Sequence, residues 1–176
     1  MNHNQLRKQK GVTLLELAFV LVIVAIMMSP MFFRFMENRD KELAKAEGDL
    51  WTTVATNSQD KYAIQPDYTG VTHTTMRLLN IFPDLMVSGT TIVNKAKGTV
   101  TCAAVDVTAT KDGLECTSTN YPKAMCNSVV GKLATAMRRV TVGSTNVKPT
   151  DGTLDMDLVS TACVSGANTL KFVIPK

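Results

Sequence analysis

Apolar residues are concentrated in one stretch near the start of the chain. From Val12 to Phe33 nearly every residue is apolar, and the stretch follows a polar head that contains Arg7, Lys8 and Lys10. As an α-helix it would be about 33 Å long, which is enough to cross the ~30 Å hydrocarbon core of a bilayer. We therefore predict that this stretch forms a transmembrane helix and that its basic head stays in the cytoplasm.

Two residues interrupt this apolar stretch. Glu16 would place a carboxylate in lipid at a high energetic cost, so a plain membrane anchor leaves it unexplained. Pro30 removes a backbone donor and clashes with the preceding turn, so we expect a helix kink there. A conventional signal peptide needs a small-residue cleavage site after its apolar region, and residues 27–33 do not supply one. These observations favour a leader peptide, residues 1–11, that is removed in front of the helix.

Helical periodicity continues beyond the apolar stretch. Met36, Leu43 and Leu50 share one helix face, whereas charged residues, among them Glu47, dominate the other positions. We expect residues 34–63 to be an amphipathic continuation of the helix with a solvated charged face. Its apolar face would support a globular domain.

The remaining residues, 64–176, contain short β-branched runs separated by turn signals, together with two helical patterns. This mixture predicts a globular head in which an antiparallel β-sheet packs against the long helix. The fold class is therefore α+β, with a long N-terminal α-helix, a second helix that has Pro122 at its first position, and disulfides. Strands are expected at residues 90–94, 98–108, 140–142 and 170–174, a short helix at 72–79, and a loop at 146–152.

The junction between the polar head and the apolar stretch carries a specific motif. Residues 10–16, Lys-Gly-Val-Thr-Leu-Leu-Glu, resemble the cleavage motif of type IV prepilins and of type II secretion pseudopilins. The resemblance implies that a prepilin peptidase cuts between Gly11 and Val12 and then N-methylates Val12. It also implies that Glu16 neutralises the Val12 amine of a neighbouring subunit, which would set the register of assembly.

The same resemblance implies partners and a location for the protein. The partners are identical pilin subunits in a helical homopolymer, the prepilin peptidase/methylase and an inner-membrane assembly platform. The precursor lies in the inner membrane, and the mature protein lies in an extracellular pilus at the cell surface. Pilin helices partly melt near a proline when the filament packs, which makes Pro30 a candidate weak point, although the family's usual proline lies a few residues later.

All four cysteines lie in the C-terminal half of the chain: Cys102, Cys116, Cys126 and Cys163. An even count in an exported chain predicts disulfides, and the count alone allows three pairings. A zinc site is the alternative, but no CxxC spacing supports it. The C-terminal third, including residues 168–174, resembles type IVb pilins. That resemblance implies a Cys126–Cys163 disulfide and leaves Cys102 to pair with Cys116.

Charge and composition point away from several other classes of protein. The formal net charge is +4, and three of the basic residues lie in the leader, so no nucleic-acid partner is expected. The sequence contains no catalytic motif, which predicts that the protein is not an enzyme and needs no cofactor. Asp151, Asp155 and Asp157 lack the spacing of an EF-hand, so we expect a polar loop rather than a calcium site, and no metal.

The combined pattern predicts a structural subunit, the major pilin of a type IVb-like pilus used for adhesion, aggregation or conjugative contact. A type II secretion pseudopilin is one alternative, which the four cysteines and the type IVb-like C-terminal third disfavour. A minor tip pilin acting as an adhesive binding module is another, and the ordinary size of the head disfavours it.

Overall fold

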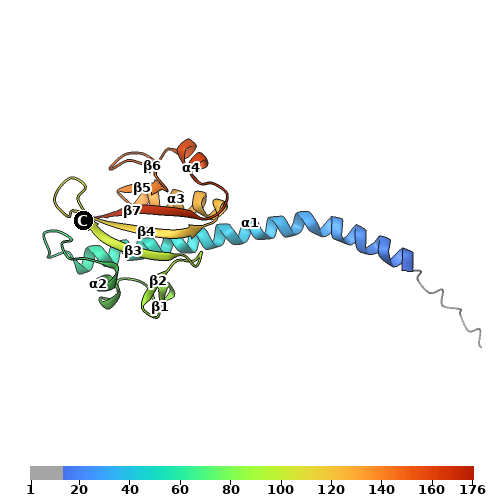
Figure 1. The fold of residues 1–176 in the computed structure, drawn as a ribbon, viewed down its shortest axis with the longest axis horizontal. Helices are drawn as coiled ribbons and strands as arrows, with labels where there is room; N and C mark the ends of the chain where they lie inside the picture. Colours follow the sequence, from blue (N-terminus) through green and yellow to red (C-terminus); the bar gives the residue numbers. More distant parts are fainter. Residues whose placement is uncertain (1–13) are drawn as a thin grey trace, which may run out of the picture. The chain divides into compact units, whose positions relative to one another are not determined.

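The computed structural model describes residues 14–176, apart from the side chains of residues 29–33 and 35–37. The chain divides into two compact units, Met1–Asn38 and Arg39–Lys176. Helix α1 (Leu14–Lys61) begins in the first unit and ends in the second, where a sheet and shorter helices form the head (Figure 1).

The head is built around one antiparallel sheet. Within the described residues the sheet has seven strands in the order β1-β2-β3-β4-β7-β5-β6, and every neighbouring pair is antiparallel. Each of the predicted strands is present, with shifted ends. The strands are β1 (Val87–Ser88), β2 (Thr91–Val93), β3 (Thr99–Val105), β4 (Gly113–Tyr121), β5 (Arg139–Val142), β6 (Thr145–Lys148) and β7 (Asn168–Pro175).

Helices cover the sheet and its connections. Trp51 of α1 packs edge-on against Phe172 of β7, with ring centroids 4.4 Å apart. At Gly48, α1 approaches α3 so closely that a Cβ would lie 2.7 Å from the Cβ of Lys132. The prediction of an α+β fold with a long N-terminal helix and an antiparallel sheet is thereby confirmed. The shorter helices are α2 (His73–Leu78), the 3-10 helix η1 (Asp84–Met86), α3 (Lys123–Ala136) and α4 (Met156–Ala162).

Three parts of the head differ from the expectation. The loop predicted at 146–152 is wrong for its first residues, which belong to β6 because Val147 is buried in the core. The pattern does not predict β4, since several of its residues are polar. It does not predict α4 either, because Asp155 resembles a loop residue. In the structure the Asp155 side chain caps α4, accepting hydrogen bonds from the N–H groups of Asp157 and Leu158 at 3.0 and 3.1 Å.

Candidate assembly site

The N-terminal part of α1 is the first candidate for an assembly surface. Every large apolar side chain from Leu14 to Met28 is exposed, and Leu14 itself is 87% exposed. Glu16 lies in the first turn of this helix and is also exposed. A helix that is apolar on all sides requires burial in lipid or against other chains, because apolar surface of this extent marks an interaction site.

The membrane and processing predictions reach beyond the described residues. Gly11 and Val12 lie outside them, so cleavage, methylation and the pairing with Glu16 stay predictions. Within the described part of the chain, no helix is both long enough and apolar enough to cross a membrane. Helix α1 continues through residue 30, and the kink at Pro30 also stays a prediction.

A buried carboxylate joins α1 to the head. Glu47 is 0% exposed, so the prediction of a solvated charged face is wrong at this position. Its Oε1 accepts hydrogen bonds from Trp51 Nε1 and Tyr121 Oη, both at 2.6 Å. Its Oε2 accepts one from the backbone N–H of Lys95 at 2.9 Å. These neutral donors replace the hydrogen bonds that water would otherwise give the carboxylate, and they thereby offset the energetic cost of burying its charge.

The hydrogen-bond network continues from Glu47 into the sheet. Tyr121 Oη and Ser118 Oγ lie 2.8 Å apart, and Asn94 Nδ2 donates to Ser118 Oγ at 2.9 Å. Asn94 Oδ1 accepts from the N–H of Gly98 at 2.7 Å and closes the turn between β2 and β3. Burial, together with the charge of Glu47, raises the pKa of Tyr121 well above its usual value, so the phenol remains a donor. The network therefore specifies how α1, β4 and this turn fit together.

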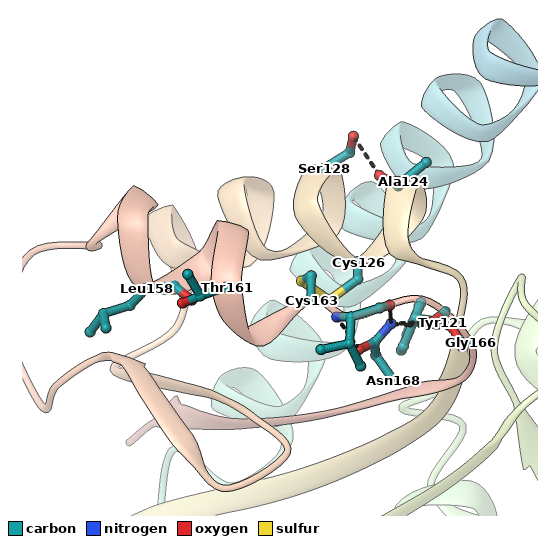
Figure 2. The surroundings of a disulfide bond; sticks show 10 residues. Tyr121, Ala124, Cys126, Ser128, Leu158, Thr161, Cys163, Gly166 and Asn168 are labelled. Carbon is teal, nitrogen blue, oxygen red and sulfur yellow. Dashed lines mark hydrogen bonds between the residues drawn. A yellow bond between two sulfur atoms is a disulfide. The ribbon is translucent and has the colours of Figure 1, made fainter.

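Two disulfides stabilise the head. Cys102–Cys116 joins directly opposite residues of β3 and β4. Cys126–Cys163 joins the first turn of α3 to the end of α4, and it is the pair that the type IVb resemblance implies (Figure 2). Beside it, Asn168 Nδ2 donates to backbone carbonyls of the loop between α4 and β7. The disulfide and the amide together fix the positions of α3, α4 and β7 relative to one another within the head.

The acidic residues Asp151, Asp155 and Asp157 have separate structural roles. Asp151 Oδ2 accepts from Arg138 Nη2 at 2.8 Å, and the hydrogen bonds from Arg138 lower the pKa of Asp151. Arg138 Nη1 also donates to Asp112 Oδ2 at 3.1 Å. Asp155 caps α4 and Asp157 lies within it, so the expected polar loop is wrong at Asp157. Among the described residues, no group of three or more potential ligands is placed to hold a metal ion.

Family models match both parts of the sequence. The model described as a prokaryotic N-terminal methylation motif matches residues 6–32, and the model described as PilS N terminal matches residues 41–175. The chain belongs to the type IV pilin family. No curated protein matches this pilin.

Solved structures of other pilins share the fold of this one. The crystal structure of a type IVb pilin from Salmonella typhi matches with a TM-score of 0.59 at 19% identity, covering 73% of this pilin and 97% of that chain. TcpA, a type IV pilin from Vibrio cholerae El Tor biotype, matches with a TM-score of 0.51 at 14% identity, covering 75% of this pilin and 98% of that chain. At these identities the likeness establishes the fold.

Family membership determines the broad role of this pilin. Type IV pilins are structural subunits rather than enzymes, and they form extracellular pili after a membrane-anchored precursor stage. The methylation motif implies that a peptidase processes this pilin and that it assembles into a pilus.

Proposed function

We propose that this pilin is the major subunit of a type IVb-like pilus, a filament that serves adhesion, aggregation or conjugative contact. The observation that carries the proposal is the exposed apolar surface of α1 from Leu14 to Met28. Burying apolar surface stabilises an assembly by about 25 cal/mol for each Å². Identical helices packed side by side would bury these side chains and leave the heads on the outside of the fibre.

The proposal assigns a role to each part of the chain. The parts are a leader (1–11), a transmembrane and polymerisation helix (12–33), an amphipathic continuation (34–63) and the head (64–176). A prepilin peptidase cuts between Gly11 and Val12 and methylates the new terminus while the precursor lies in the inner membrane. An assembly platform in that membrane then adds the subunit to the fibre.

Glu16 is proposed to select the register between subunits. After cleavage, the amine of Val12 and the carboxylate of Glu16 are each costly to bury alone, so subunits dock where the two meet. Glu16→Ala should leave export and cleavage intact and should lower the yield of sheared fibres by about tenfold or more. Glu42→Ala, which changes an exposed carboxylate further along α1, is the matched control and should assemble normally. A normal fibre yield from Glu16→Ala would contradict this role.

Shear fractions separate the major-pilin proposal from its two alternatives. Abundant protein in long surface fibres supports a major pilin, trace amounts indicate a minor tip pilin, and no protein outside the cell indicates a secretion pseudopilin. Two features favour the major pilin. The head contains two disulfides, and this pilin covers 97% of the solved Salmonella typhi type IVb chain, which favours a head of ordinary size over an enlarged tip domain.

A further inference from the structure

The head contains a groove whose lining is largely apolar. Its volume is about 740 Å³, and it lies between α1, the β2–β3 turn, the start of α3 and the loop before β7. Leu43, Pro122 and Met125 supply apolar side chains to the lining. All lining residues belong to the Arg39–Lys176 unit, and the volume is large enough to receive protruding side chains of another molecule.

The lining of this groove also carries a net positive charge. Arg39, Lys95 and Lys97 line the groove, and Asp40 contributes the one carboxylate among the lining residues. Within the part of the chain that the structure describes, none of the three cations forms an ion pair. An occupant with an apolar tip and negative charges would therefore match the groove in both respects.

The groove is preformed because the turn that carries its two lysines is held in place. Glu47 Oε2 accepts a hydrogen bond from the N–H of Lys95 at 2.9 Å. On the other side, a Cβ at Gly98 would lie 1.8 Å from the backbone oxygen of Thr119, so the turn packs directly against β4. A rigid site loses little conformational entropy when it is filled, which favours binding.

Helix α4 presents a surface of the complementary kind. Met156 is 58% exposed and Leu158 is 40% exposed, and Leu158 points away from the Cys126–Cys163 disulfide (Figure 2). Asp155 and Asp157 alternate with these apolar residues, and α4 contains no basic residue. The four residues are termed the α4 knob. The knob combines exposed apolar side chains with the carboxylate of Asp157, whereas the carboxylate of Asp155 caps the helix.

We propose that the α4 knob of one subunit inserts into the groove of a second copy of this chain. The apolar tip of Leu158 meets the apolar part of the lining, while the neighbouring carboxylate of Asp157 faces the cations of the lining. Knob and groove are different surfaces, so each subunit uses its knob on one neighbour and its groove on another. Such a heterologous contact can extend as an open helix instead of closing a dimer. The inference rests on the proposed filament and adds a contact between heads to the packing of α1.

The test is chemical cross-linking in sheared fibres of the full chain. Leu158→Cys is combined with Ala96→Cys, which changes a residue of the groove. The fibres are treated with a short bis-maleimide, because direct disulfide formation would demand a narrow geometry. We expect a ladder of covalent species beyond the dimer on a denaturing gel. The matched control, Leu85→Cys with Ala96→Cys, uses an exposed apolar residue of η1 and should yield monomers.

The outcomes separate this inference from the proposed function. Intact fibres that yield only monomers from the Leu158/Ala96 pair would overturn it. A ladder that stops at the dimer would overturn it as well, because it indicates a reciprocal contact. A ladder from the control pair alone would assign the groove to η1. If the unmodified protein forms no fibres, the proposed function fails instead.

A charge exchange keeps the inference testable if the cysteine variants do not assemble. Asp157→Lys and Lys97→Asp should each lower the yield of sheared fibres by about three- to tenfold, because each places like charges opposite one another. The two changes together should restore about half of the normal yield or more, since the pair is then matched again. Full yield from both single variants, or no recovery in the double variant, would overturn the knob-in-groove contact.

Discussion

Glu47 offers the sharpest test of how α1 is attached to the head. Replacing it by Ala removes the acceptor of Trp51 Nε1 and of the Lys95 N–H, whereas Tyr121 keeps Ser118 as a partner. Each buried donor left without a partner costs about 1–3 kcal/mol. With the cavity that the shorter side chain leaves, we expect the free energy of unfolding to fall by about 3–5 kcal/mol.

Glu47→Gln removes the charge while keeping the shape of the side chain. The amide oxygen can still accept from Trp51 and Tyr121, but the amide NH₂ then faces the N–H of Lys95, and two donors oppose each other. The loss of one hydrogen bond to a charged group should lower the free energy of unfolding by about 1.5–3 kcal/mol. Glu42→Gln, at an exposed position of the same helix, is the control and should change it by no more than about 0.5 kcal/mol.

The assay is guanidinium unfolding of the full chain in detergent, with both disulfides intact. The chain contains a single tryptophan, and Trp51 itself donates to Glu47, so its fluorescence reports directly on this region. Stability is compared through midpoints at constant slope. A Glu47→Gln variant as stable as the Glu42→Gln control, or more stable than the unmodified protein, would refute the argument. Such a result would mean that the desolvation free energy of the carboxylate exceeds the stabilisation from its three hydrogen bonds.

Three further predictions concern packing, titration and covalent staples. Gly48→Ala should destabilise the head by about 1–3 kcal/mol because its Cβ would meet Lys132. Gly131→Ala, whose Cβ would meet no atom within 4 Å beyond the adjoining residues of its own helix, should stabilise the head by up to about 1 kcal/mol, and thermal unfolding compares the two variants. Burial raises the pKa of Tyr68 from 10.0 to about 12, so the folded head holds this proton more tightly than the unfolded chain does. That stabilisation is complete below pH 10.0 and is lost as the pH rises to about 12, so Tyr68→Phe should flatten the alkaline decline of the unfolding midpoint. Replacing both cysteines of the α3–α4 disulfide by Ala should lower the free energy of unfolding by about 4 kcal/mol, and replacing those of the β3–β4 disulfide should lower it by about 3 kcal/mol. The first loss is larger because that disulfide closes a loop of 37 residues and the other a loop of 14, and denaturant titrations measure both. Equal costs for the two disulfides would contradict the loop-length argument.

The features that could be predicted from the sequence are those encoded in local pattern. The apolar run that opens α1 and the proline before α3 are visible in a few consecutive residues. The class of fold follows from them, because a long helix with one apolar face and several β-branched runs must pack together. The resemblance of the C-terminal third to type IVb pilins predicted the Cys126–Cys163 disulfide, whereas the cysteine count alone allowed three pairings.

The features that could not be predicted depend on partners far away in the chain. Glu47 and Glu42 look alike in sequence, and only the first is buried, because Tyr121 and Lys95 reach it from 74 and 48 positions away. The sequence pattern does not predict strand β4 for a similar reason. Its Ser118 faces the interior and looks like a surface residue until its neighbours satisfy the hydroxyl. Tertiary hydrogen bonds therefore reverse what polarity alone suggests.

The position of β7 has a consequence for how the head forms. Among the described strands it comes last along the sequence, but it lies between β4 and β5 in the sheet, and those two strands pair with it rather than with each other. A polypeptide synthesised from its N-terminus therefore cannot complete this sheet until residues 168–175 have been made. Until then β4 and β5 each present an open edge that can capture a strand from another molecule. Newly made chains are therefore most prone to aggregate after β5 has been synthesised and before β7 has joined the sheet.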